Sequence, residues 1–79
     1  MMKEIQLFGI LKEQYGSSVF VEVSTLPISA KELVAAFRNQ FQEVQEVPFL
    51  IAKNHFMIQE NEFIEAEVHV ALLPPVSGG

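Results

Sequence analysis

The sequence contains no cysteine among its 79 residues. Disulfide bonds, thiolate nucleophiles and cysteine-ligated zinc or iron–sulfur centres are therefore excluded within this chain. The sequence also lacks any run of the roughly 18 to 20 apolar residues that a membrane helix needs. Its first residues lead directly into a strand-like pattern instead of a signal peptide. We therefore expect a cytoplasmic protein that does not enter a membrane.

Basic residues are scarce. Five Lys and Arg stand against ten Asp and Glu, for a net charge of −5, which repels phosphate backbones and anionic lipids. We therefore expect no nucleic-acid partner, and a basic protein partner is more consistent with this charge. A glycine-rich phosphate-binding loop is also missing, so we expect no bound cofactor, and ATP would have to be bound by another protein.

Apolar residues are plentiful by comparison, at 49% with seven Phe, which is enough for the core of one small domain. Residues 3–8 and 19–23 alternate apolar and polar side chains with the two-residue period of strands. Between them, residues 10–15 followed by Gly16 predict a short helical turn with a glycine C-cap. The two strands are predicted to pair as a hairpin.

The clearest helix begins at Ser29, which forms a capping box with Glu32. Pro48 marks the end of the helical region, because proline disfavours a helical residue before it. Between these limits one apolar stripe recurs at three- and four-residue steps, at Leu33, Val34, Phe37, Phe41 and Val44. A stripe of this kind needs a sheet to cover it.

The remaining sequence predicts strands over residues 49–53 and 56–58, joined by a turn at Asn54-His55. A polar loop follows, and the last strand is predicted from Glu67 to Leu73. The order of strand, strand, helix, strand, short strand, strand is that of an α+β β-grasp fold, in which a mixed sheet of four to five strands wraps around one main helix. We expect this domain to span residues 1–73.

The crossover through the helix places the first and last strands parallel at the sheet centre. Leu7 and Val70 would then face the helix. Phe8 and Leu73 would lie on the opposite, outer face.

Residues 74–79, "PPVSGG", form a predicted extended tail. Pro74 and Pro75 cannot donate ladder hydrogen bonds and stop the strand, and from there six residues reach about 18 Å in the polyproline conformation. Gly78 and Gly79 have no Cβ, so another protein or a small substrate can approach the last carbonyl closely. Converting that carboxylate to an acyl-adenylate would open it to a sulfur or nitrogen nucleophile.

Four segments together carry a resemblance: "LFGILKEQYG", "SAKELVAAF", "IAKN" and above all "VALLPPVSGG". The chain resembles, over its whole length, the small, sulfur-carrying subunits of molybdopterin synthase, the MoaD family of ubiquitin-like β-grasp proteins. The last segment is the most specific, since related diglycine carriers usually lack "PPVSGG".

The resemblance implies that Gly79 is adenylated by an ATP-dependent activating enzyme and then thiocarboxylated with sulfur from a donor such as a cysteine desulfurase. The thiocarboxylate would donate sulfur to cyclic pyranopterin monophosphate, forming the dithiolene of molybdopterin. The tail would enter the active site of a large catalytic subunit, within a heterotetramer. The chain would be a sulfur-donating subunit and not an enzyme by itself. The partner-binding residues implied are Phe8, Leu73, Pro74, Pro75, Val76, Ser77 and Gly78.

Other candidates for chemistry are weaker. His55 and His69 are not at metal-ligand spacing, so we expect structural or surface roles and no metal site. An acidic stretch is better explained as a solvated face or a docking contact for a basic partner than as a weak cation site. It comprises Glu60, Glu62, Glu65 and Glu67. Ser77 has no base near it in the sequence, so we do not expect a nucleophile.

Two rival functions stay open. The first is another diglycine carrier, of the thiamine type or a ubiquitin-like modifier that conjugates to lysines. The second is an interaction domain whose tail takes no part in chemistry.

Overall fold

The computed structural model describes residues 1–44 and 48–75. Its elements run in chain order as β1 (Met2–Leu7), α1 (Ile10–Tyr15), β2 (Ser18–Glu22), β3 (Ile28–Ser29), α2 (Ala30–Gln40), the 3-10 helix η1 (Gln42–Val44), β4 (Leu50–Lys53), β5 (Phe56–Ile58), β6 (Phe63–Ile64) and β7 (Val70–Leu73). This is the predicted order, with the addition of the short strands β3 and β6.

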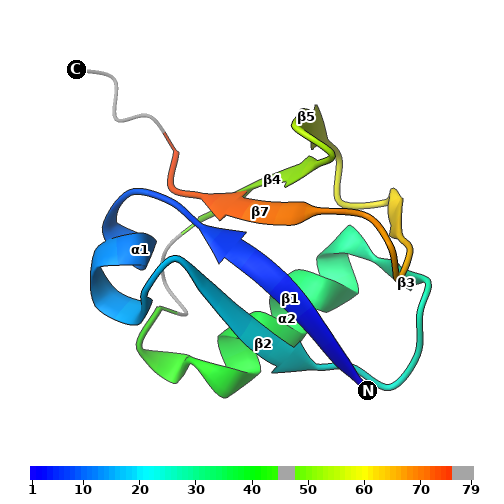
Figure 1. Ribbon diagram of the computed structural model, residues 1–79, viewed down its shortest axis with the longest axis horizontal. Coiled ribbons are helices and arrows are strands. Elements are labelled where there is room, and N and C mark those ends of the chain that lie inside the picture. Colours follow the sequence, from blue (N-terminus) through cyan, green and yellow to red (C-terminus); the bar gives the residue numbers. More distant parts are fainter. Residues whose placement is uncertain (45–47, 76–79) are drawn as a thin grey trace.

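The main sheet has five strands in the order β2-β1-β7-β4-β5. β1 and β7 are parallel neighbours at its centre, with Leu7 opposite Leu72, and the other pairs are antiparallel. Figure 1 shows α2 lying behind β1 and β2, across one face of the sheet. The predicted β-grasp, with a mixed sheet around one main helix, is confirmed.

The core lies between α2 and this sheet. Leu33 and Phe37 from the helix stripe are fully buried, and they share a cluster with Leu7 and Val70 from the two central strands. The capping box forms as predicted, because Ser29 Oγ accepts from the backbone N–H of Glu32 at 3.1 Å. These apolar contacts are the main source of stability in a domain of this size.

The helix is shorter than its apolar stripe predicts. α2 ends at Gln40, and the C-cap Phe41 has φ −119° and ψ 75°, outside the helical region. The Phe41 ring packs instead between Phe37 and Tyr15, at centroid distances of 5.0 and 4.8 Å. The stripe therefore changes direction at Phe41, before η1 begins. The side chain of Val44 lies outside the described part of the chain.

The prediction that the last strand begins at Glu67 is wrong, since β7 begins at Val70. The buried Lys3 explains the difference: its Nζ donates to the carbonyls of Ala66 at 2.9 Å and Val68 at 2.5 Å. Those carbonyls serve a side chain and not a strand ladder. Burial lowers the pKa of Lys3, and the carboxylates of Glu67, Glu4 and Glu65 act in the opposite direction.

Smaller differences concern strand ends. β2 is displaced by one residue from the predicted span of residues 19–23, and β4 begins at Leu50 instead of Phe49. β5 has the predicted bounds, and the preceding turn places Asn54 and His55 at φ 50° and 73°, as tight hairpins require. Within the described ranges, no helix has the length and apolar character needed to cross a bilayer.

The Lys3 contacts yield a stability prediction. Lys3→Met keeps the length of the side chain but leaves the carbonyls of Ala66 and Val68 without their donor, so we expect a loss of about 2 kcal/mol in the free energy of unfolding. Urea denaturation of both proteins measures it. Lys12→Met, at an exposed position of α1, is the control and should change stability by less than about 0.5 kcal/mol. Equal effects of the two substitutions would contradict the role given to Lys3.

Candidate functional site at the end of the last strand

The predicted tail begins where β7 ends. Pro74 follows Leu73 directly and is half-buried, and Pro75 is exposed. No ladder bond is possible at the nitrogen of either proline, which agrees with the strand ending at Leu73. The remaining tail residues, Val76 to Gly79, lie outside the described residues, so the predicted reach of the tail and the role of Gly79 stay predictions.

Gly9 makes room for the start of the tail. Because β1 and β7 are parallel and Leu7 lies opposite Leu72, both strands end at the same edge and Gly9 comes level with Pro74. A Cβ built on Gly9 would lie 2.7 Å from Pro74 Cγ, and Gly9 has φ 62°, which favours glycine. The Phe8 N–H donates to Leu72 O at 3.3 Å and extends the pairing to this point. Gly9 therefore permits the path by which the chain leaves the sheet.

Strand periodicity does not indicate this role of Gly9. The signal was present in the sequence: a glycine directly follows the first strand, and a proline directly follows a last strand predicted to be parallel to it. Counting the register forward from those two strands would have placed the two residues together.

An apolar hollow lies on the outer face of the sheet beside this exit. Phe8 and Leu73 both line it, as the strand alternation predicts, and Phe8 is 42% exposed. Met57 and Ala52 also line it, and Met57 is 55% exposed. Periodicity within each segment does not bring these two residues together, because the pairing of β4 with β5 places Met57 opposite Ala52.

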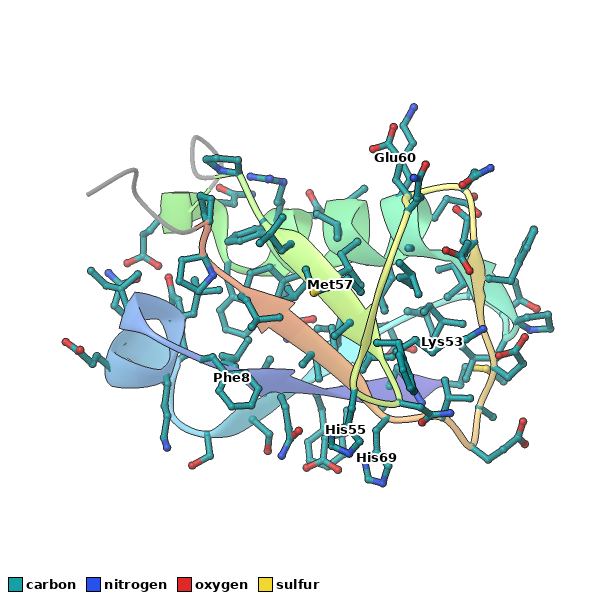
Figure 2. All side chains as sticks on the ribbon, turned by 90° about the horizontal axis from the view of Figure 1, so that it is seen from above. Phe8, Lys53, His55, Met57, Glu60 and His69 are labelled. Atoms are coloured by element: carbon teal, nitrogen blue, oxygen red, sulfur yellow. The ribbon has the colours of Figure 1, made fainter. Side chains whose placement is uncertain are left out.

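The two histidines border the same hollow. Figure 2 shows His55 and His69 with Phe8 on the side of the sheet away from α2. Asn54 joins their two loops, since its N–H donates to His69 O at 2.8 Å and its Oδ1 accepts from His69 N at 2.9 Å. Among the described residues no group of three or more His, Cys, Asp or Glu side chains is placed to hold a metal ion.

Part of the acidic stretch has a local structural role. Glu65 forms an ion pair with Lys53 at 3.2 Å, and Lys53 Nζ also donates to Phe63 O at 2.8 Å. Glu62 accepts from the backbone N–H of Gln59 at 3.0 Å. These contacts hold the loop between β5 and β7, while Glu60 and Glu67 are exposed. The arrangement supports a solvated face more than a cation site.

Comparison with protein families gives one match: the profile described as the ThiS family covers residues 5–79. No curated protein matches the chain. Among solved structures, a chain from the complex of subunits 1 and 2 of the molybdopterin-converting factor from Helicobacter pylori is 32% identical, with all of both chains covered and a TM-score of 0.63.

Two further structures agree in fold. SAMP1 from Haloferax volcanii has a TM-score of 0.79 at 24% identity, with all of both chains covered. A putative molybdopterin converting factor subunit 1 from Pyrococcus furiosus has a TM-score of 0.80 at 15% identity, covering 96% of this chain and 99% of its own. At these identities the likeness shows the fold alone.

Gly9 yields a prediction with a matched control in the same chain. Gly16 also has a positive φ, of 96°, but a Cβ there would meet nothing within 4 Å. Gly16→Ala should therefore suffer only backbone strain, while Gly9→Ala should suffer strain and the clash with Pro74. We expect Gly9→Ala to be about 1 kcal/mol more destabilising in chemical denaturation.

Adding Pro74→Ala removes the Cγ that the new methyl group would meet. This second substitution should bring the cost of Gly9→Ala down to that of Gly16→Ala. If Gly9→Ala lowers the free energy of unfolding no more than Gly16→Ala does in the wild-type background, the position of Pro74 does not require a glycine at residue 9.

Proposed function

The chain belongs to the ThiS family, and from this premise we propose that it is a sulfur carrier whose Gly79 is adenylated and then thiocarboxylated. We further propose that it is the small subunit of molybdopterin synthase. In that role the thiocarboxylate donates sulfur to cyclic pyranopterin monophosphate, and the chain is a non-catalytic subunit of the complex. The proposed site of action is cytoplasmic.

One observation carries the choice of pathway. The identity of 32% over all of both chains links this chain to a complex of subunits 1 and 2 of a molybdopterin-converting factor, which supports a larger second subunit as the partner. The segment "VALLPPVSGG" supports the same choice, because it includes the strand, the two prolines and the diglycine in one continuous run.

The proposed chemistry takes place on the main chain. The Gly79 carboxylate attacks the α-phosphate of ATP in the activating enzyme and releases pyrophosphate. The persulfide of a donor such as a cysteine desulfurase then displaces AMP from the acyl carbon. A thiol cleaves the resulting acyl disulfide, forming a new disulfide and leaving a thiocarboxylate on Gly79. No side chain of this protein has to act as acid, base or nucleophile. The absence of cysteine is therefore compatible with sulfur transfer.

The described part of the site would serve recognition. The close approach of Gly9 and Pro74 fixes where the chain leaves the sheet, and the hollow lined by Phe8, Met57 and Leu73 lies beside that point. A partner that receives the tail would meet this apolar surface at the same time. Exposed apolar side chains beside a functional segment are typical of an interface.

The alternative is a carrier for another pathway or a protein modifier. The similarity to SAMP1, which a second Haloferax volcanii structure describes as a small archaeal modifier protein, keeps the modifier in consideration. A thiamine-type carrier is equally compatible with the family. The covalent partners of the protein separate these functions, because a modifier forms isopeptide bonds to lysines and a carrier forms a thiocarboxylate.

The role of Gly79 is tested by deleting it. We expect the shortened chain to show the same circular dichroism and denaturation midpoint as the full chain, but to gain no thiocarboxylate when incubated with activating enzyme, ATP and sulfur donor. Intact mass spectrometry detects the replacement of one oxygen by sulfur. Asn61→Ala, at an exposed position in the loop between β5 and β6, is the control and should be sulfurated like the wild type. Sulfuration of the shortened chain to the wild-type extent would overturn the assignment of Gly79.

The apolar surface is tested at Phe8. Phe8→Ser should weaken binding of the large subunit by roughly tenfold or more, since a buried aromatic contact at an interface usually contributes over 1 kcal/mol. Phe20→Ser removes a residue of the same type, 54% exposed on the outer face of the edge strand β2, and should have little effect. Calorimetric titration measures both, and equal weakening would contradict the proposed surface.

A further inference from the structure

Gln40 covers the open edge of the sheet. β2 is the first strand of the order β2-β1-β7-β4-β5, so within residues 1–44 and 48–75 it pairs only with β1. The Gln40 side chain, at the end of α2, donates from Nε2 to Phe20 O at 2.8 Å and accepts at Oε1 from Glu22 N at 3.3 Å. A single carboxamide thus presents to β2 the donor and acceptor that a peptide group of a neighbouring strand would present. Figure 1 shows α2 passing behind β2.

The groups that Gln40 covers belong to a regular set. In an antiparallel strand the N–H and C=O of one residue point to the same side, and consecutive residues alternate. Since Phe20 O and Glu22 N face away from β1, the main-chain groups of Ser18, Phe20 and Glu22 form the edge. Edges of this kind pair readily with other strands unless something covers them.

This edge is complementary to itself. In a two-fold antiparallel pair centred on Phe20, each Phe20 lies opposite its own copy, and Ser18 lies opposite Glu22 of the other copy. In this pairing the exposed Phe20 rings of the two copies lie opposite each other. The Ser18 hydroxyl lies opposite the Glu22 carboxylate, so no two like charges are directly opposite. The charge of Glu22 is also offset within its own chain, because it forms an ion pair with the Met1 ammonium at 2.6 Å.

We propose that β2 is a latent dimerisation edge for a second copy of this chain, and that the Gln40 carboxamide keeps it closed. The two-fold ladder contains three hydrogen-bonded residue pairs and would return three bonds per protomer, while each protomer would lose its two bonds to Gln40. The cover therefore offsets most of the hydrogen-bond gain of pairing, and the remaining bond and the apolar contact between the Phe20 rings are left to oppose the entropy cost of association. Removing the carboxamide restores the gain.

Sedimentation equilibrium of three proteins tests this inference: the wild type, Gln40→Ala, and Asn39→Ala as a control one position earlier on α2. We expect Gln40→Ala to lower the dimer dissociation constant by on the order of a hundredfold. The wild type and Asn39→Ala should stay monomeric at the same concentration. A folded Gln40→Ala that remains as monomeric as the wild type overturns the proposal, as does a wild type that dimerises equally well.

A second variant covers the case in which Gln40→Ala does not fold. Gln40→Glu keeps the size of the side chain and can still accept from Glu22 N, but the ionised carboxylate cannot donate to Phe20 O. It should therefore dimerise more tightly than the wild type. If folded Gln40→Glu is no more dimeric than the wild type, the proposal that the Gln40 carboxamide keeps the β2 edge closed is overturned.

The register is tested by disulfide trapping, which the absence of native cysteine makes specific. In the Gln40→Ala background, a mixture of Ser18→Cys chains and Glu22→Cys chains should cross-link as heterodimers faster than either chain cross-links to itself. Adding Phe20→Lys places like charges on the two-fold axis and should abolish dimerisation. Dimers that persist with Phe20→Lys, or cross-links without preference for the heterodimer, would show that another surface associates.

Discussion

The parallel pairing of β1 and β7 at the sheet centre is the constraint on which the rest of the structure depends. It buries Leu7 and Leu72 side by side against α2, and it brings the ends of two strands that are distant in sequence to the same edge. Gly9 and Pro74 meet there because the register requires it. The place where the tail leaves the domain is therefore a consequence of core packing.

The same pairing also generates the outer surface. Side chains alternate across the sheet, so each residue that fills the core is followed by one on the opposite face. Phe8 and Leu73 follow the buried Leu7 and Leu72 in this way and come to line one hollow. Met57 reaches it through the hairpin of β4 and β5. The core, the exit of the tail and the candidate docking surface are thus linked by one register.

In the part of the chain that the structure describes, the two edge strands of the sheet, β2 and β5, each lack a neighbouring strand on one side. β5 is short, with three residues, while the longer β2 is covered by the side chain of Gln40. In the proposed carrier role, a covered edge would keep the chain from pairing with its own copies. One polar residue at the end of the main helix, Gln40, covers this edge.

Sequence periodicity predicted the strands and helix that carry a clear repeat, together with the capping box at Ser29 and the parallel arrangement of β1 and β7. It missed β3 and β6, since two residues are too few to show a period. It placed the start of the last strand too early, because the Lys3 side chain takes the carbonyls of Ala66 and Val68 from more than sixty positions away. The contacts of Gly9 with Pro74 and of Gln40 with β2 also join segments that are distant in the sequence. Periodicity within a single segment cannot predict such contacts.

The central claim is that the terminal acyl group of this chain carries the transferable sulfur to a pterin precursor. The most direct measurement mixes the chain with the proposed large subunit, an activating enzyme, ATP, an isotopically labelled sulfur source and cyclic pyranopterin monophosphate. Mass spectrometry then follows the label. The account predicts label first in a thiocarboxylate at Gly79 and then in the dithiolene of the product. Lysine-linked adducts with no labelled thiocarboxylate would contradict it.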